Sequence, residues 1–348
     1  MKKQEAGKQR PRLVLTALGA VLLAVFLISF SLGRYGVPPR QVLRILFSRL
    51  FALFAPGGGL EQTWTVQMET AVINIRLPRI LMACLVGCSL SAAGATYQGV
   101  FQNPMASPDI LGASSGAAFG AALAILTGAS TRGITTSAFF FSLVTVLLVY
   151  LIARRAPGLR VVNLILAGIM VSSLFSAGTS YIKLVADPTN QLPQITYWLM
   201  GSLSGTRLAD IPHAFLPMLL GLLPLFLLRW QINLLSLGDQ EARTLGVNTD
   251  LVRLALILGS TLVTAASVSF SGMIGWVGLV IPHLCRKLVG SDYRYLMPGS
   301  FLAGATFLLV VDDVSRNLLA VEIPIGILTA FIGAPFFLYL ITQKEKAL

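Results

Sequence analysis

Charged side chains are scarce in this sequence. Asp, Glu, Lys and Arg make up 11% of its 348 residues, whereas about a quarter of a typical soluble domain is charged. Hydrophobic residues make up 55%, and the mean hydropathy is +0.79. These values exclude a disordered chain, a nucleic-acid-binding domain and an ordinary cytosolic enzyme. They indicate a polytopic membrane protein.

Cysteine is also rare, and the phosphate-binding motif of nucleotide hydrolases is absent. The three cysteines are too few for a disulfide framework. Cys84 and Cys88 stand one helical turn apart in an apolar run, so we expect them to pack as small hydrophobic side chains. No Gly-x-x-x-x-Gly-Lys-Ser/Thr sequence occurs. The chain is therefore not expected to hydrolyse ATP.

Few ionisable residues fall inside the long apolar stretches. A transporter driven by an ion gradient usually needs such residues, because the coupling ion must be bound within the bilayer. Asp312 and Asp313 are the best candidates. Arg316 follows three to four residues later, so the three side chains can pair on one helix face near the outer end of their span. This pairing argues against an ion-coupled transporter, which stays an alternative.

Apolar stretches long enough to cross a bilayer recur along the chain. Ten membrane-spanning helices are predicted, at residues 13–33, 76–100, 110–129, 134–153, 161–183, 210–229, 251–270, 274–290, 296–316 and 324–342. The segment 188–206 is interrupted by proline and glycine and predicts an interfacial helix followed by a turn. Ser271, Gly272 and Gly275 predict a turn between the seventh and eighth spans.

The expected fold class is thus an all-α polytopic membrane protein. A single ten-helix membrane domain is expected over residues 13–343, with short tails at 1–12 and 344–348. Basic residues precede the first apolar run, as in a signal peptide, but the run is long and lacks a clear cleavage site. An uncleaved first span is therefore favoured. Ten spans put both termini on one side, and most of the 26 Lys and Arg residues lie inside if that side is the cytoplasm.

The remaining positive charge is concentrated between the first two spans. That stretch contains Arg34, Arg40, Arg44, Arg49, Arg76 and Arg79. These arginines can pair with lipid phosphates or with Glu61 and Glu69. They can equally dock an acidic protein partner. The sequence leaves these explanations open.

Small residues recur every four positions in three of the predicted spans. They are Gly87, Ser91, Ala95 and Gly99; Gly112, Gly116 and Gly120; and Gly326, Ala330 and Ala334. Such ladders let helix backbones approach closely in lipid. They predict a dense helix bundle and do not by themselves identify a pore.

A short charged segment lies between the sixth and seventh spans. Gly238 and Gly246 bracket a predicted helix of mixed charge with one small residue, Ala242. A compact helix at the membrane surface suits docking into a groove on a soluble partner. A plain charged loop fits the residues as well.

Four segments together resemble a known family. They are Arg76-Leu77-Pro78-Arg79 with the stretch from Gln98 through Asn103-Pro104 to Gly112, then Gly238 to Gly246, Gly272 to Arg286 with Gly278 to His283 inside it, and Glu322 to Ala330 with Gly333-Ala334-Pro335. In this order they are similar to the signatures of FecCD-type permeases of ATP-binding-cassette importers. Those permeases import iron-siderophores, haem and cobalamin. The resemblance covers roughly residues 70–343.

The resemblance implies a type II importer fold, in which two permease copies, identical or related, form the pore. Two cytoplasmic ATPase subunits would bind ATP and Mg²⁺, and an extracytoplasmic binding protein would deliver the substrate. The permease would be a transporter subunit rather than an enzyme, with no cofactor or metal of its own and no nucleic-acid partner. It would lie among the lipids of a bacterial or archaeal cytoplasmic membrane, with both termini in the cytoplasm.

The resemblance also implies roles for particular residues. The binding protein would dock on Arg76, Arg79 and Arg316. The segment 237–250 would couple to the ATPase through Gly238, Glu241, Ala242, Arg243, Leu245 and Gly246. The cytoplasmic gate would comprise Asn103, Pro104, Met105, Val161 and Val162. Some relatives carry small hydroxyl residues where the two valines stand, so the valines suggest a more hydrophobic seal.

These inferences predict the permease subunit of a binding-protein-dependent importer that moves an iron chelate, such as a ferric siderophore, by ATP-driven alternating access. Cobalamin, haem or an oxyanion are alternative cargoes for the same machinery. Ion-coupled secondary transport is the alternative from a different class. His213 and His283 could be imagined as haem ligands, but their positions fit interfacial and structural roles better.

Overall fold

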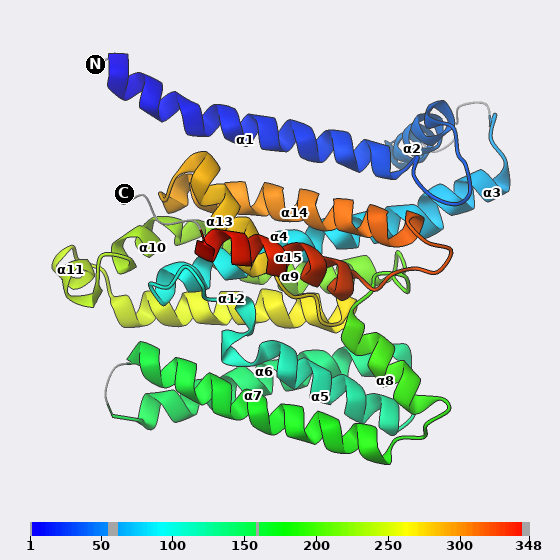
Figure 1. Cartoon of the computed structure of the whole chain (residues 1–348). Helices are drawn as coiled ribbons and strands as arrows, with labels where there is room; N and C mark the ends of the chain where they lie inside the picture. The colour runs from blue at the N-terminus through cyan, green and yellow to red at the C-terminus, as the bar shows by residue number, and fades with distance from the viewer. Residues whose placement is uncertain (1, 55–61, 158–159, 343–348) are drawn as a thin grey trace.

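The computed structural model describes residues 2–54, 62–157 and 160–342, and its regular elements in these ranges are all helices (Figure 1). In chain order they are α1 (Lys2–Ser29), α2 (Pro39–Phe54), α3 (Val66–Glu69), η1 (Thr70–Arg76), α4 (Leu77–Val100), η2 (Pro108–Leu111), α5 (Ala113–Leu126), α6 (Thr131–Arg155), α7 (Arg160–Val185), α8 (Gln191–Met200), α9 (Asp210–Leu227), α10 (Arg229–Leu235), α11 (Asp239–Thr244), α12 (Thr249–Ser271), α13 (Val277–Val289), α14 (Tyr293–Asn317) and α15 (Ile325–Thr342). η1 is a π-helix and η2 a 3₁₀-helix. The expected all-α fold is confirmed.

Each of the ten expected spans corresponds to a helix. Those long and apolar enough to cross a membrane are α1, α4, α6, α7, α9, α12 and α14. Of the other three, α5 and α13 are shorter, and α15 is among the shorter apolar helices with Ile325–Tyr339. α8 forms where the interfacial helix was expected, and Gly201 turns the chain after it with a φ of 73°.

Helix boundaries differ from expectation near the N-terminus. α1 begins at Lys2 rather than at residue 13, because the basic residues continue the same helix, and only Pro11–Ser29 has the composition of a span. α3, η1 and α4 form one helical run from Val66 to Val100, so the second span starts well before residue 76. The seven-residue π-helix η1 joins α3 to α4 within that run.

α2 was not expected, because its arginines interrupt the apolar sequence. The helix turns Val42 and Ile45 into the protein and leaves Leu43, Phe47 and Phe51 exposed. The exposed three follow one another at four-residue spacing and so lie on one face. α2 is therefore an amphipathic helix, placed beyond the C-terminal end of α1 (Figure 1).

α4 lies at the centre of the bundle, between α14 and α12 (Figure 1). Every residue from Ser89 to Val100 is buried. A Cβ atom added at Gly87 would lie 2.2 Å from the carbonyl oxygen of Gly304 in α14. One added at Gly94 would lie 1.8 Å from the carbonyl oxygen of Gly278 in α13. The small-residue ladder of α4 therefore packs directly on the backbone of α14 at Gly87, as predicted, and Gly94, outside the ladder, packs in the same way on α13.

Helices α5 to α8 form a second layer beside α12 (Figure 1). The rings of Phe119, Phe141 and Phe175 meet edge to face inside this layer, with centroids 5.2 and 5.4 Å from Phe119. α5 packs closely on α6 because Gly116 and Gly120 have no side chain, and an added Cβ at either position would collide with α6. The layer reaches α12 and its following turn, where a Cβ at Gly272 would lie 2.3 Å from the carbonyl oxygen of Trp198.

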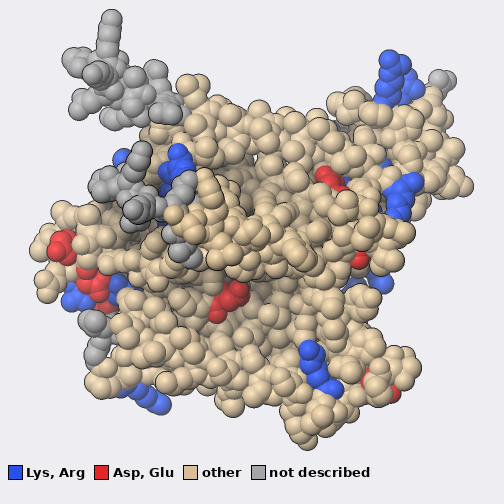
Figure 2. Space-filling view, viewed as in Figure 1, with Lys and Arg blue, Asp and Glu red and all other residues tan. Residues whose placement is uncertain are grey.

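The bundle has two distinct ends. The start of α1, the helices α10 and α11, and the end of α15 lie at one, which we call the α11 end; α2 and α3 lie at the other, the α2 end (Figure 1). Figure 2 shows charged side chains mainly toward these two ends, with a mostly uncharged surface between them. This distribution is that of a protein whose helices cross a bilayer from end to end.

Candidate functional site

α11 is a six-residue helix held between two glycines at the α11 end. Gly238 precedes it with a φ of 125°, and a Cβ there would lie 2.3 Å from Oε2 of Glu241. Gly246 follows it with a φ of 83°. The amide of Val247 donates to the carbonyl of Ala242 at 3.1 Å, and the amide of Gly246 donates to that of Arg243 at 3.0 Å. These bonds form a Schellman cap, which favours glycine at its left-handed position.

Ion pairs hold α11 against the start of α12. The two Nη atoms of Arg253 lie 2.5 and 3.1 Å from the carboxylate oxygens of Asp239. Arg253 is only 5% exposed, so its end of this pair is shielded from water. Arg243 donates to Oγ1 of Thr249 at 3.1 Å and lies 3.4 Å from Asp250. The helix α11 therefore has a fixed orientation on the bundle.

The residues expected to couple to an ATPase divide into an inner and an outer set. Ala242 is fully buried and packs toward the bundle. Glu241, Arg243 and Leu245 are exposed. Leu245 is 60% exposed and Leu237, just before the helix, is 61% exposed. The segment thus presents leucines and charged groups together on a fixed support.

The loop residues expected at the gate form a tight turn between α4 and η2. The side-chain oxygen of Asn103 accepts a hydrogen bond from the amide of Met105 at 2.9 Å, and its carbonyl accepts one from the amide of Ala106 at 3.1 Å. The turn around Pro104 leaves Met105 50% exposed.

The two expected gate valines lie on α7, next to the element that follows this loop. Val161 and Val162 lie in the first turn of α7, and Val162 is exposed. η2 touches α7 where a Cβ at Gly168 would lie 2.2 Å from the carbonyl oxygen of Ile110. The structure thus places both parts of the expected gate on adjoining elements.

Gln102 connects the gate loop to the segment that leads into α11. Its φ is 49°, in the left-handed region that few non-glycine residues adopt. Its Nε2 donates to the carbonyl of Leu235, the last residue of α10, at 2.8 Å. Sequence reasoning missed this residue. The sequence feature that could have indicated it is its position four residues after Gln98 of the motif, about one helical turn away.

α10 is also joined to the start of α14. Nδ2 of Asn233 donates to Asp292 at 2.9 Å, and the amide of Tyr293 donates to Oδ1 of Asn233 at 2.9 Å. Burial alone would raise the pKa of Asp292, but hydrogen bonds from Arg294 and Asn233 outweigh it and lower that pKa below its ordinary value. Asp292 is therefore ionised at neutral pH and holds the connection.

The three arginines expected to dock a binding protein lie toward the α2 end and point into the protein. Arg76, Arg79 and Arg316 are 4%, 6% and 7% exposed. Arg79 donates from Nε to Asp312 at 2.9 and 3.0 Å. It also donates from Nη1 to Glu322 at 2.9 and 3.0 Å. Asp312 is fully buried, whereas the side chain of Glu322 is 38% exposed and is the most accessible carboxylate of this group.

The same group of charges fastens α1 to the bundle. Arg76 donates to the carbonyls of Phe30, at 2.5 Å, and of Tyr35. Arg316 donates to the carbonyl of Ser29 at 2.9 Å and pairs with Asp313. The predicted grouping of Asp312, Asp313 and Arg316 on one helix face is confirmed. The ion pair of Asp312 with Arg79, a residue distant in the sequence, was not expected.

Metal-ligating side chains are dispersed over the part of the chain that the structure describes. There, no group of three or more His, Cys, Asp or Glu residues is arranged to hold a metal ion. Nδ1 of His213 lies 2.9 Å from the carbonyl oxygen of Ala209, one turn earlier in the chain. Cys84 and Cys88 are unpaired thiols on α4.

Comparison with known proteins gives consistent matches over nearly the whole chain. Residues 21–343 match the FecCD transport family. The chain is 41% identical to the molybdate import system permease protein MolB of Haemophilus influenzae, over 96% of either chain. It is 39% identical to the cobalamin import system permease protein BtuC of Halobacterium salinarum, over 94% of this chain and 95% of that protein.

A solved structure shows the same fold. It is described as an inward-facing ABC transporter of metal-chelate type, and it superimposes with a TM-score of 0.82 at 39% identity, over 95% of this chain and 99% of that one. Further relatives are named for hemin transport in Yersinia pestis and for Fe(3+)-citrate import in Bacillus subtilis.

The fold and these similarities define the class of protein as the membrane permease of an ABC importer. The chain belongs to the FecCD transport family. It is therefore a multi-pass transporter subunit of the inner membrane, and is not itself an enzyme.

Proposed function

We propose that this chain, paired with a second copy or a related permease, forms the pore of an importer for a metal chelate. An iron chelate such as a ferric siderophore is the first candidate cargo. The metal-chelate type of the similar solved transporter and the relative named for Fe(3+)-citrate support this choice. Cobalamin, haem and molybdate are the alternative cargoes, because relatives are named for each of them.

In this proposal α11 docks into a cleft of a cytoplasmic ATPase subunit, which binds ATP and Mg²⁺. The observation that carries it is the support of α11: two glycine turns and the pair of Arg253 with Asp239 hold the exposed Glu241 and Leu245 at a fixed place. The α11 end then faces the cytoplasm, and with it the start of α1 and the end of α15 (Figure 1).

Closure of the ATPase pair would displace α11 and change the gate. The hydrogen bond from Gln102 to Leu235 transmits the displacement to the turn formed by Asn103, Pro104 and Met105. Val161 and Val162 on α7 supply the facing apolar seal. The cycle is an alternation between two packed arrangements, which ATP binding and hydrolysis bias in turn.

Replacing Glu241 tests the coupling role of α11. Glu241→Lys reverses a charge on the exposed side of the helix, away from the buried Ala242, so the fold should be kept. We expect that the ATPase no longer co-purifies with the permease and that ATP-dependent uptake falls about tenfold or more. A tenfold fall corresponds to the loss of about 1.4 kcal/mol of binding energy between the two subunits. Both are measured with the permease reconstituted beside its ATPase.

The neighbouring exposed residue provides the control for this experiment. Gln240→Lys also adds a lysine to α11 and should leave most of the recruitment intact. Equal losses in the two variants would assign the effect to surface charge in general. Uptake that continues without any ATPase would contradict the proposed function itself.

We further propose that a carboxylate of an extracytoplasmic binding protein docks on Arg79, with Arg76 and Arg316 supporting the site. Nη2 of Arg79 is buried without a hydrogen-bond partner among the described residues, and the accessible Glu322 lies beside it. A partner carboxylate would therefore compete with Glu322 for the guanidinium group. This competition makes Glu322 a regulator of docking strength.

Removing the competing carboxylate should tighten docking. Glu322→Gln is expected to raise the affinity for the binding protein roughly threefold to tenfold at low salt, and less at high salt, because exposed charges are screened. Glu69→Gln is the control, since it removes another carboxylate that is paired with an arginine, Arg49, toward the α2 end. Unchanged or weaker docking of the Glu322 variant would refute this role for Arg79.

A further inference from the structure

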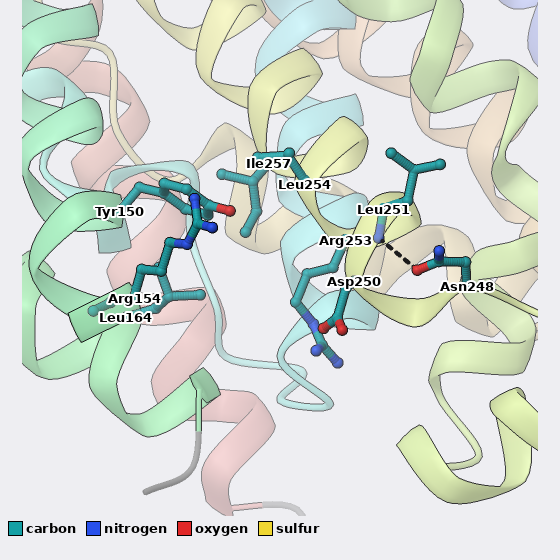
Figure 3. Close-up of a pocket in the computed structure, with 10 residues that line it drawn as sticks. Tyr150, Arg154, Leu164, Asn248, Asp250, Leu251, Arg253, Leu254 and Ile257 are labelled. Carbon is teal, nitrogen blue, oxygen red and sulfur yellow. Dashed lines mark hydrogen bonds between the residues drawn. The ribbon is translucent and has the colours of Figure 1, made fainter. Parts of the chain in front are cut away.

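A pocket of about 350 Å³ lies at the α11 end between α6, α7 and α12 (Figure 3). Tyr150 and Arg154 of α6 form one wall, and Asp250 and Arg253 at the start of α12 lie across from them (Figure 3). Leucine and isoleucine side chains complete the lining, from Leu164, Leu251, Leu254 and Ile257. The pocket therefore combines cationic groups with an apolar wall.

Two arginines of this pocket have unused hydrogen-bonding capacity. Arg154 makes no hydrogen bond or ion pair with any residue that the structure describes. Arg253 uses its Nη atoms on Asp239, but its Nε is buried and has no partner among the described residues. A buried donor without an acceptor is costly, so such a group is usually satisfied by a ligand or water.

The ionised side chains of the lining are two arginines and one carboxylate, Asp250, so positive charge is in excess there. Asp250 also lies 3.4 Å from Arg243, outside the pocket. The pocket also lies at the N-terminus of α12, a 23-residue helix whose cap is Asn248. Helix N-termini attract anions, because several backbone amides there lack helical partners.

Apolar surface continues from the pocket toward the middle of the bundle. On α6, Leu147 lies on the same face as Tyr150 and Arg154 and is 55% exposed. On α12, Leu258 lies on the same face as Leu251 and Leu254 and is 59% exposed. A ligand that fits both parts has an anionic head and a hydrocarbon chain.

We infer that this pocket binds the phosphate headgroup of an anionic phospholipid from the leaflet at the α11 end. The phosphate lies between Arg154 and the N-terminus of α12, within reach of Nε of Arg253, and an acyl chain lies along Leu147 or Leu258. Basic pockets between membrane helices are suited to such headgroups. Because Arg253 also holds Asp239 of α11, the bound lipid stabilises the position of α11.

Lipid titration of the purified permease tests this inference without any partner protein. The delipidated permease in detergent is titrated with phosphatidylglycerol, and separately with phosphatidylcholine that has the same acyl chains. Native mass spectrometry counts the bound lipid molecules. A thermal melt measures the stability of the permease. We expect phosphatidylglycerol to bind preferentially and to raise the melting temperature. Arg154→Gln should weaken its apparent affinity roughly tenfold, the effect of losing one charge-assisted hydrogen bond.

The adjacent arginine is a matched control. Arg155 is exposed, stands in the same last turn of α6 and does not line the pocket, so Arg155→Gln should keep the preference for phosphatidylglycerol. Arg154→Lys retains the charge and should lose less affinity than Arg154→Gln. Its lipid binding would also show that the permease still folds when this residue is replaced.

Three results would overturn the assignment. Equal losses in the variants of Arg154 and Arg155 would show a general surface-charge effect. The same stabilisation by inorganic phosphate alone would show a site for a small anion rather than a lipid. Unchanged lipid binding by Arg154→Gln would show that the lipid phosphate does not bind in this pocket. Failure of the transport function would leave this binding test unaffected, because the test uses the permease alone.

Discussion

Gly94→Ala is expected to prevent the permease from folding stably. The added Cβ would lie 1.8 Å from the carbonyl oxygen and 2.6 Å from the Cα atom of Gly278, so the obstacle is backbone and not a flexible side chain. α4 and α13 would have to separate at the centre of the bundle, where α4 is buried from Ser89 to Val100. The cost is about 3 kcal/mol or more. The yield of monodisperse protein and its melting temperature measure the effect.

A second glycine in the same region supplies the control for this prediction. Gly275 lies in the turn before α13, and a Cβ there would meet nothing within 4 Å. Gly275→Ala should therefore be close to wild type in yield and melting temperature. A Gly94→Ala protein as stable as the Gly275 variant would mean that the two helices do not pack backbone to backbone.

Asp312→Asn is expected to destabilise the protein and to reduce uptake only as far as folded protein is lost. The carboxylate is fully buried and pairs with Arg79, so its removal leaves a buried guanidinium group with only Glu322 as an acidic partner. Loss of one member of a buried pair costs about 3 kcal/mol. Thermal melts give the stability, and uptake is normalised to folded permease in proteoliposomes.

The alternative of ion-coupled transport makes the opposite prediction for this residue. If Asp312 bound a coupling ion, Asp312→Asn would be stable and yet inactive, and uptake would follow an ion gradient without an ATPase. Glu322→Gln serves as the comparison for stability, because it removes a partly exposed carboxylate from the same arginine and should cost less than about 1 kcal/mol. A stable but inactive Asp312 variant would therefore support an ion-coupled transporter instead.

The sequence was sufficient to predict the helices that depend on local composition. Long apolar runs, their proline and glycine interruptions, and the ladder from Gly87 to Gly99 are all local patterns, and each corresponds to a helix, a turn or a close packing surface. α2 was missed because its arginines hide its amphipathic character in a search for uninterrupted apolar runs. η1 was missed because a π-helix has no recognisable composition.

Contacts between distant segments could not be predicted from the sequence in the same way. Arg79 and Asp312 are 233 residues apart, so their pairing depends on how α4 and α14 cross. The hydrogen bond from Gln102 to Leu235 depends on a backbone conformation that no residue pattern announces. Family resemblance identified Arg76, Arg79 and Arg316, but it did not indicate that all three point inward.

The attachments of the α11 segment also have a mechanical consequence. Gln102, just after α4, holds the end of α10; Asn233 joins α10 to the start of α14; and Arg253 joins α11 to α12. Three separate anchor points fix a rigid body, whereas one would leave it free to swivel. In the proposed coupling role, bending at Gly238 would have to break the pair of Arg253 with Asp239, so a push on α11 would reach α12 through that pair and α10 through the chain. It would shift the ends of three helices in a single stroke, and the segment from α10 to α11 would then work as a lever and not as a flexible tether.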